Sequence, residues 1–268
     1  MQATLPTGDQ VLVALQGAQV LSWTTSDGAE RMYLSPRALF DGHSPIRGGV
    51  PVCFPQFNQR GSLPKHGFAR NLPWRLEASA ASTDSIQMQL LLEASEQTRV
   101  WWPDHSFAAR LCMTLSRDAL KLELSAHNTG ATSWGFTAAL HSYLRVDDIA
   151  QTQLEGLGGQ ARWNAVADVR DVQQGPVTFH GEYDSVFAAA AAPLQLQQSS
   201  GASLSIAQSP DWGNTVVWNP GSALSAQLTD MPDDGFQHML CVEAACIDQP
   251  VHLAPGEQWS GWQQLRVL

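Results

Sequence analysis

The sequence predicts an all-β protein, a large antiparallel two-sheet sandwich with very little helix. Short runs of alternating apolar and polar residues dominate its 268 residues, and turn-forming residues separate them. We find no sustained apolar stripe with the 3.6-residue period of a helix. An apolar fraction of 44% with 15% charged residues is typical of a chain that folds around a core. These observations favour a sandwich.

The strongest strand signals are paired runs around short turns. Residues 10–23 predict two strands around Gln16-Gly17, and residues 107–130 predict a hairpin that turns at Arg117-Asp118. Residues 193–208 repeat this pattern around a turn at 199–201. Further strands are expected at 85–95, 134–146, 214–220, 238–247 and 258–268. Only Ser35–Phe40 resembles a helical turn, with Ser35 as cap and Pro36 at the first helical position.

The chain contains no low-complexity linker and no fixed-period repeat, so we expect a single domain over residues 1–268. The longest apolar runs are far shorter than the roughly 20 residues of a membrane span, and the first residues do not resemble a secretory signal. The four cysteines form no C-x-x-C, which favours a reduced, cytoplasmic protein. A net charge of -10 argues against nucleic acid or membrane partners. We expect a small-molecule partner and, by default, a monomer.

The sequence indicates neither a metal site nor a common nucleotide or nucleophile motif. None of the eight histidines stands in an H-x-H, H-x-x-x-H or H-E-x-x-H arrangement, and no cysteine lies at zinc spacing from one. There is no G-x-S-x-G and no glycine-rich phosphate loop, and Gly156–Gly159 is interpreted as a turn. We therefore expect no metal and no cofactor.

Three titratable residues on or beside expected strands are candidates for chemistry. Glu243 lies in a strand of small apolar residues, where an unpaired carboxylate is costly or has a raised pKa. We favour a position in a cleft over a structural ion pair. His141 is expected well within a strand and is equally consistent with a core histidine. Asp184 follows a loop and is equally consistent with an exposed turn residue.

A basic window at residues 42–76 contrasts with the acidic chain. It contains no carboxylate but has two histidines and five cations, Arg47, Arg60, Lys65, Arg70 and Arg75. Its first half is rich in Gly and Pro, which predicts a fixed, irregular loop. Arginines on such a loop can present paired N–H donors to a phosphate. Alternatively, the absence of carboxylates from this window is due to chance, and its cations form ordinary salt bridges to acids elsewhere in the chain.

Six segments, in this order, resemble a known family: PIRGGVPVCFPQF (45–57), LPKHGFARNLPW (63–74), LHSYLRVDDI (140–149), YDSVF (183–187), VVWNP (216–220) and CVEAA (241–245). They are similar to the hexose-6-phosphate mutarotases, or glucose-6-phosphate 1-epimerases, a branch of the aldose 1-epimerase (galactose mutarotase-like) superfamily. The resemblance implies a β-supersandwich. It also implies cofactor-free interconversion of the α and β anomers of a hexose 6-phosphate, with glucose 6-phosphate as the expected substrate.

The resemblance also implies roles for individual residues. His141 would be the general acid and Glu243 the catalytic glutamate. His66 and Asp184 would bind the sugar, and Arg47 and Arg70 the phosphate. One departure is Ser185, because many relatives have a basic residue directly after the aspartate. This leaves the local contacts of Asp184, and the substrate preference, open.

Two other functions remain as alternatives at this stage. A mutarotase for unphosphorylated aldoses would use the basic window only for structure, so Arg47 and Arg70 distinguish it from the phosphate-specific enzyme. A non-catalytic carbohydrate-binding sandwich would have no need of a proton-transfer pair, so His141 and Glu243 distinguish that class. Fold alone cannot choose between these functions.

Overall fold

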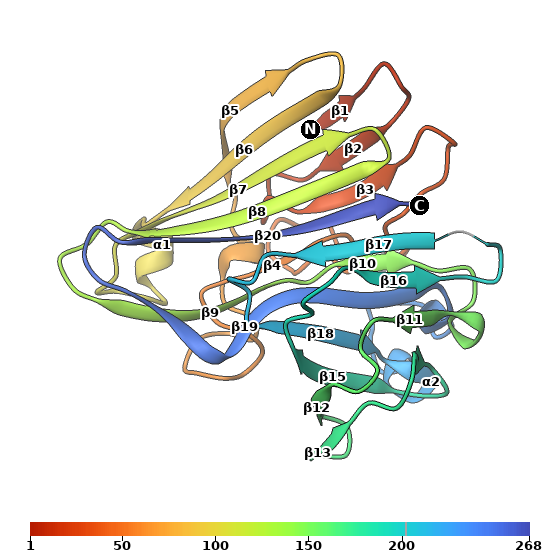
Figure 1. The fold of residues 1–268 in the computed structure, drawn as a ribbon. Helices are drawn as coiled ribbons and strands as arrows, with labels where there is room; N and C mark the ends of the chain where they lie inside the picture. Colours follow the sequence, from red (N-terminus) through yellow and green to blue (C-terminus); the bar gives the residue numbers. More distant parts are fainter. Residues whose placement is uncertain (202) are drawn as a thin grey trace.

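Two large antiparallel sheets face each other in the computed structural model of the chain (Figure 1). The structure describes residues 1–201 and 203–268, so Ala202, in the loop of the hairpin predicted at 193–208, lies outside the described residues. One sheet has nine strands, which are, in spatial order, β14 (Val177–Thr178), β11 (Gln153–Glu155), β16 (Leu194–Gln197), β17 (Ser203–Gln208), β20 (Gln258–Val267), β8 (Ala119–Asn128), β7 (Phe107–Ser116), β6 (Ser85–Glu93) and β5 (Arg75–Ala81).

The second large sheet has eight strands and positions the site described below. Its spatial order is β13 (Val169–Val172), β12 (Ala161–Asn164), β15 (Tyr183–Ala188), β18 (Asn214–Asn219), β19 (Met239–Leu253), β9 (Trp134–Leu140) and β4 (Val52–Cys53), with β10 (Tyr143–Arg145) paired to β19. The predicted all-β sandwich of two large sheets is confirmed.

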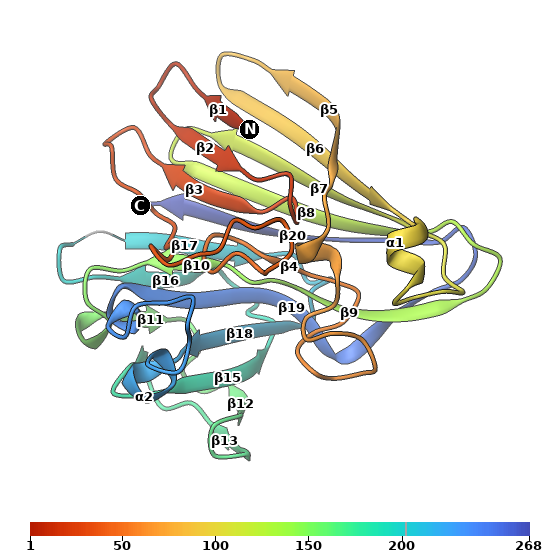
Figure 2. The ribbon, with the colours of Figure 1, turned by 180° about the vertical axis from the view of Figure 1, so that it is seen from behind.

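A third, three-stranded sheet at the N-terminus was not predicted. It comprises β1 (Gln2–Thr4), β2 (Gln10–Val13) and β3 (Val20–Thr24). Figure 2 shows these strands lying against the part of the nine-stranded sheet that contains β6, β7 and β8. Periodicity correctly placed β2 and β3 around Gln16-Gly17, but it cannot tell which sheet a strand joins.

The helices are short. They are α1 (Glu96–Arg99), α2 (Gly221–Ser225) and the 3₁₀ turns η1 (Ala69–Asn71), η2 (Ile149–Gln151) and η3 (Gly235–His238). Across the described residues, none is long and apolar enough to pass through a membrane.

Alternation along the strands separates core from exterior. In β19, Leu240, Val242 and Ala244 belong to the main core between the sheets. Cys241 and Ala245 lie on the opposite face, in separate buried clusters. Because successive side chains point to opposite faces, Glu243 shares this outer face. Loops cover the face, so Glu243 is only 1% exposed.

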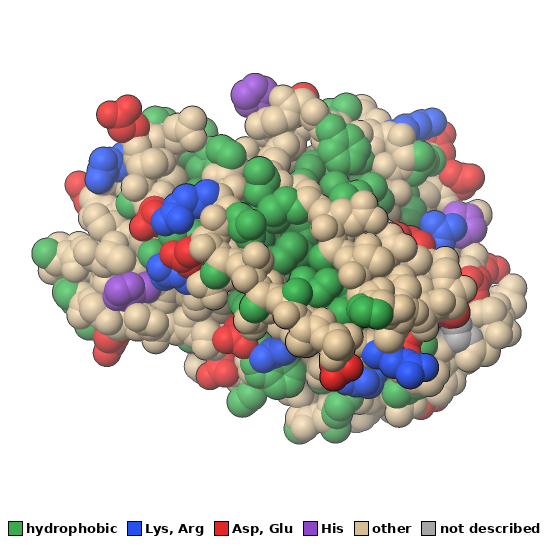
Figure 3. All heavy atoms as spheres, turned by 90° about the horizontal axis from the view of Figure 1, so that it is seen from above, with side chains coloured by type: hydrophobic (Ala, Val, Ile, Leu, Met, Phe, Trp, Pro, Cys, Tyr) green, Lys and Arg blue, Asp and Glu red, His purple; other side chains and the backbone are tan. Residues whose placement is uncertain are grey.

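The surface also contains apolar groups. Seen from above, apolar side chains gather at the centre of the face and are surrounded by scattered Lys, Arg, Asp and Glu side chains (Figure 3). Neither sign of charge forms a continuous field on this face, although the net charge of the chain is -10.

The predicted turn at Ser35–Phe40 is confirmed as a single turn with Ser35 as its cap, closed by hydrogen bonds from Ala38 N–H to the Ser35 carbonyl and from Arg37 N–H to Ser35 Oγ, at 3.0 and 3.1 Å. One local prediction was wrong. His141 is not within a strand, because the expected strand divides into β9 and β10 at His141-Ser142. The His141 N–H bonds to the carbonyl of Pro51 in a loop, and Ser142 N–H turns back to Leu140.

The alternation predicts that substitutions at inward-facing and outward-facing positions of β8 differ sharply in their effect on the free energy of unfolding. Leu122 faces the core and is 1% exposed, whereas Ser125 points to the outer face of the same strand. We expect Leu122→Ala to lower the free energy of unfolding by about 2–5 kcal/mol, and Ser125→Ala to change it by about 0.5 kcal/mol or less. Urea unfolding monitored by circular dichroism measures both. Equal losses would contradict the assigned faces.

Candidate active site

A cavity of about 290 Å³ lies between the outer face of the eight-stranded sheet and the loop of residues 45–70. All six residues singled out from the sequence line it, although they come from separate parts of the chain. They are Arg47, His66, Arg70, His141, Asp184 and Glu243.

The sheet provides one wall through the register of its strands. Asp184 in β15 lies opposite Trp218 in β18, and Val216 lies opposite Glu243 in β19. Neighbouring strands are about 4.8 Å apart, so side chains from these three strands stand within about 10 Å of one another on one face. Trp218 was not selected from the sequence. It lines the cavity because an alternating strand places it on the same face as Val216.

The loop provides the opposite wall, and two of its glycines permit close packing, of Gly49 on β3 and of Gly67 on Phe54 within the loop. A Cβ on Gly49 would lie 1.9 Å from the Val20 carbonyl oxygen, and one on Gly67 would lie 2.1 Å from that of Phe54. Both glycines have positive φ. His66, which precedes Gly67, also has a φ of 66°, a left-handed conformation that costs energy in a residue with a Cβ. The loop therefore holds His66 against the sheet in a strained conformation.

His141 and Glu243 form the centre of the cavity. His141 Nε2 lies 3.4 Å from Glu243 Oε1. Among the residues that the structure describes, the other polar atoms of the pair, Nδ1 and Oε2, are buried and have no hydrogen-bond partner, and the same is true of Nε of Arg70. Buried polar atoms are normally paired. Three unpaired atoms around one cavity are consistent with groups reserved for a ligand.

Burial shifts both groups of this pair toward their neutral forms. The pKa of Glu243 is raised well above its ordinary value by burial and then by the nearby charge of Asp184. The pKa of His141 is lowered to about 3 by burial and then by Arg70 and Arg47. Transfer of one proton from the Glu243 carboxyl to the His141 ring converts the neutral pair into an imidazolium–carboxylate pair. The pair can therefore change between these two forms without exchanging a proton with water.

His66 is a neutral hydrogen-bond donor. The backbone N–H of Asn58 donates to its Nδ1 at 3.3 Å, and Cys53 Sγ lies 3.2 Å from the same nitrogen. Since a backbone N–H can only donate, Nδ1 must be unprotonated, and the ring proton resides on Nε2. Burial, and then the charge of His141, lowers the pKa of His66 far below its usual range.

Four of the five cations of the basic window line the cavity: Arg47, Arg60, Lys65 and Arg70. Arg75 does not, and it pairs with Glu93 instead. The salt-bridge alternative is correct in part, because Arg47 pairs with Asp230 at 3.1 Å and Arg60 with Asp248 at 3.8 Å. Asp184 and Glu243 stand on the sheet side. The four cations therefore stand on the loop side of the cavity and these two acids on its sheet side, while Asp230 lines the cavity beside Arg47.

Ser185 does not alter the cavity. It follows Asp184 in β15 and points to the opposite side, where it is 1% exposed. Asp184 and Val186 both line the cavity, as strand alternation requires. A basic side chain at position 185 would point away from the substrate side.

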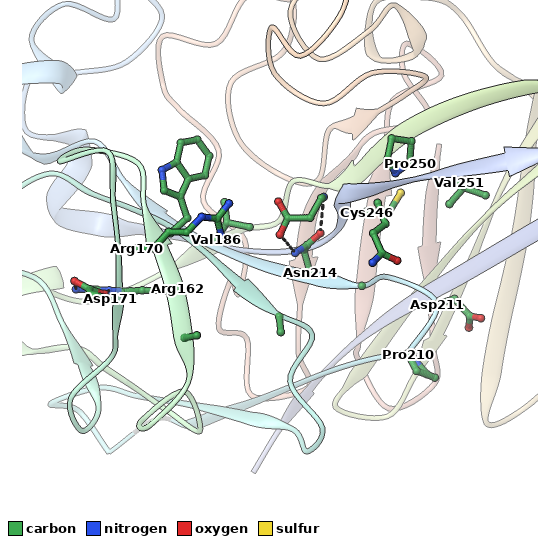
Figure 4. Close-up of a pocket in the computed structure, with 16 residues that line it drawn as sticks. Arg162, Arg170, Asp171, Val186, Pro210, Asp211, Asn214, Cys246, Pro250 and Val251 are labelled. Carbon is green, nitrogen blue, oxygen red and sulfur yellow. Dashed lines mark hydrogen bonds and ion pairs between the residues drawn. The ribbon is translucent and has the colours of Figure 1, made fainter.

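A larger cavity of about 630 Å³ lies on the same sheet, beside the first (Figure 4). Arg162, Asp171, Asn214 and Cys246 are among its lining residues, and Trp163 and Val186 line both cavities. Asn214 is held by a 3.1 Å bond to Asp248. Neither His141 nor Glu243 lines this cavity, so the His141–Glu243 pair belongs to the smaller one. In the described chain, no three His, Cys, Asp or Glu side chains are grouped to hold a metal ion.

Asp184 provides a test of the electrostatics of the site. Burial, and then Glu182, raises its pKa from 3.8 to about 6, so its charged form destabilises the fold above this pH. We expect Asp184→Asn to raise the free energy of unfolding by about 1–3 kcal/mol near pH 8. The gain should shrink as pH falls from about 6 and vanish below 3.8, where the carboxyl becomes neutral in the unfolded state as well. Urea unfolding at several pH values measures the difference in the free energy of unfolding. An Asp184→Asn variant that is less stable than the wild type near pH 8 would contradict the raised pKa of Asp184.

The comparisons with known proteins agree with this geometry. The family model described as "Aldose 1-epimerase" matches residues 1–266. A Salmonella typhimurium protein named "Putative glucose-6-phosphate 1-epimerase" is 37% identical over 88% of this chain and 80% of its own length. One with the same name from Cenchrus ciliaris is 33% identical over 93% of this chain and 78% of its own length.

The similarity extends to three dimensions. A crystal structure described as a "putative mutarotase" from Salmonella typhimurium superposes with a TM-score of 0.92 at 33% identity, covering 99% of this chain and 89% of that one. The resemblance stated from six sequence segments is therefore confirmed over the whole chain. This protein belongs to the aldose 1-epimerase family, and it is an isomerase of the mutarotase-like β-sandwich fold.

Proposed function

We propose that this protein interconverts the α and β anomers of a hexose 6-phosphate, with glucose 6-phosphate as the expected substrate, and uses no cofactor. The observation that supports this most directly is the His141–Glu243 pair, 3.4 Å apart in a cavity with four cations. The names of the relatives at 33% and 37% identity support the same substrate class.

The geometry suits ring opening by paired proton transfer. Glu243 removes the proton from the O1 hydroxyl while His141 protonates the ring oxygen O5. Both oxygens are bonded to C1, so the base and the acid must stand close together, as Oε1 and Nε2 do. Rotation about the C1–C2 bond then presents the other face of the aldehyde, and the reverse transfers close the ring. Each positioned group contributes about 10²–10⁴-fold.

The cavity supplies binding groups for the rest of the substrate. Arg70 and Arg47 take the phosphate, and Arg70 has one buried N–H without a partner. Lys65, which had no role at the level of sequence, lines the same side. His66 donates its Nε2 proton to a sugar hydroxyl, and Asp184 accepts from another. Four cations in the cavity favour the phosphorylated substrate over a neutral aldose, and the proton-transfer pair favours an enzyme over a binding module.

We further propose that residues 1–268 act as one domain, as a monomer in the cytoplasm, without nucleic acid or membrane partners. One continuous core cluster that includes residues from Leu5 to Leu265 supports the single domain. A net charge of -10 supports the absence of anionic partners. Light scattering measures the oligomeric state.

The acid–base assignment predicts the loss of turnover without loss of folding. We expect Glu243→Gln and His141→Asn each to lower kcat for glucose 6-phosphate anomers by about 10²–10⁴-fold. Exchange NMR at anomeric equilibrium measures the rates, with the protein-free rate subtracted. Circular dichroism and thermal unfolding confirm that the variants are folded. Wild-type turnover in either variant would exclude that residue from proton transfer.

The phosphate assignment predicts a selective loss. Each charge-assisted hydrogen bond contributes about 1.5–3 kcal/mol, so Arg70→Ala should lower kcat/KM for glucose 6-phosphate by about 10–100-fold. The same substitution should lower kcat/KM for glucose much less. Sulfate should inhibit the wild-type enzyme competitively against glucose 6-phosphate. Arg75→Ala is the matched control, because Arg75 belongs to the same window but does not line the cavity. Lack of inhibition by sulfate, together with an unaffected Arg70→Ala variant, would favour the enzyme for unphosphorylated aldoses.

A further inference from the structure

Glu243 orients the His141 ring from one side, since its Oε1 lies 3.4 Å from Nε2. Nδ1 of the ring is buried and has no hydrogen-bond partner among the described residues, whereas a catalytic histidine is usually oriented by an acceptor for the proton on its second nitrogen. The ring is instead held by aromatic contacts. Tyr143 stacks on it at a centroid distance of 4.8 Å and an interplanar angle of 11°. Trp218 and His66 meet the same ring edge-to-face, at 5.9 and 5.5 Å.

Tyr143 is itself fixed by the cations of the cavity. Its hydroxyl oxygen accepts a 2.9 Å hydrogen bond from Nη1 of Arg47. Arg47 is in turn held by Asp230, whose Oδ1 lies 3.1 Å from both Nε and Nη2. Tyr143 is 3% exposed and paired with Cys241 in the sheet, so it has little freedom to move. A continuous chain of contacts therefore joins Asp230, Arg47, Tyr143 and His141.

Arg47 keeps donors for a ligand in spite of these contacts. A guanidinium has five N–H groups, and the hydrogen bonds from Nε to Asp230 and from Nη1 to Tyr143 occupy two of them. Nη1 keeps one N–H and Nη2 keeps two, with Nη2 also 3.1 Å from Asp230 Oδ1, and Arg47 lines the cavity. Asp230 and Tyr143 thus fix the plane of the guanidinium and leave one edge of it available.

The charges around His141 oppose its protonation in the free protein. After burial, Arg70, Arg47 and Lys65 all lower its pKa, and His66 is a neutral neighbour. Glu243 is the acidic partner, while Asp184 and Asp230 stand elsewhere on the cavity wall. A dianion bound between Arg47 and Arg70 would offset their charge and so favour the imidazolium that donates a proton.

We propose that Tyr143 is a positioning residue that couples occupation of the phosphate subsite to the acid function of His141. Through the Arg47–Tyr143–His141 contacts, a bound dianion both secures the orientation of the imidazole and stabilises its charged form. The phosphate group then contributes to kcat as well as to binding. This inference rests on the proposed function and adds the coupling to it.

The coupling can be measured by separating the sugar from the dianion. D-Xylose lacks the C6 arm and leaves the phosphate subsite free, and sulfate fills that subsite without acting as a general base. We expect sulfate to inhibit turnover of glucose 6-phosphate but to accelerate the catalysed mutarotation of xylose by about tenfold, the effect of one pKa unit. Sodium chloride at equal ionic strength controls for screening.

Two variants test the role of Tyr143. Tyr143→Phe keeps the stacked ring but removes the acceptor for Arg47. We expect sulfate to accelerate xylose turnover only about threefold or less in this variant, while its inhibition constant against glucose 6-phosphate stays close to that of the wild type. Tyr33→Phe removes a hydroxyl from another buried tyrosine in the same cluster and should behave as the wild type. Its normal behaviour would exclude a general effect of hydroxyl loss.

The outcomes separate the two proposals. Competition by sulfate without acceleration of xylose turnover in the wild type would overturn the coupling and leave the proposed function intact. Full acceleration in Tyr143→Phe would overturn the role of Tyr143. Absence of any catalysed mutarotation would overturn the proposed function and, with it, this inference. Acceleration in the wild type and in Tyr33→Phe, with its loss in Tyr143→Phe, would support the coupling.

Discussion

The contact between the loop of residues 45–70 and the outer face of the eight-stranded sheet determines every other property of the site. The loop is itself closely packed, because a Cβ on Gly67 would meet the carbonyl oxygen of Phe54 within the loop and one on Gly49 would meet that of Val20 in β3. Burial beneath the loop raises the pKa of Glu243 and lowers that of His141, so both groups shift toward their neutral forms. The strained conformation of His66 is part of the same closure.

Desolvation and charge act together in this cavity. Burial is the largest influence on His141, Glu243 and Asp184, and the neighbouring charges are second. A ligand that carries negative charge to the loop side and hydroxyl groups to the sheet side would satisfy both. The protein therefore holds several groups in states that cost stability.

The sequence was most informative where a residue conflicted with its local pattern. A carboxylate between Val242 and Ala244 in an apolar strand indicated a site, and a window without acids indicated the cationic wall. The family resemblance joined them. The position of His141 was wrong because alternation continues through residues 134–146, whereas the chain turns aside to bond with Pro51.

Other features depend on register and on contacts between distant segments, which one sequence does not reveal. Trp218 lies beside Asp184 only because β15 and β18 pair in one particular register. The third sheet forms because β3 pairs with β2 and not with a strand of either large sheet, and no local pattern determines that choice. The contacts of Arg47 with Asp230 and Tyr143 join residues far apart in the chain, and no local pattern marks them.

The two walls of the site rest on the same core. Glu243 is anchored in β19, a central strand whose other face contributes to the main core, so its backbone opens only when the sandwich itself unfolds. The segment that carries the cations also contributes Val50, Val52, Phe54 and Phe68 to this core. The His141 N–H bonds to the carbonyl of Pro51 in the same segment. We therefore expect both walls to be lost in one cooperative transition on heating, without a folded state that keeps Glu243 and His141 in place but lacks the cationic wall.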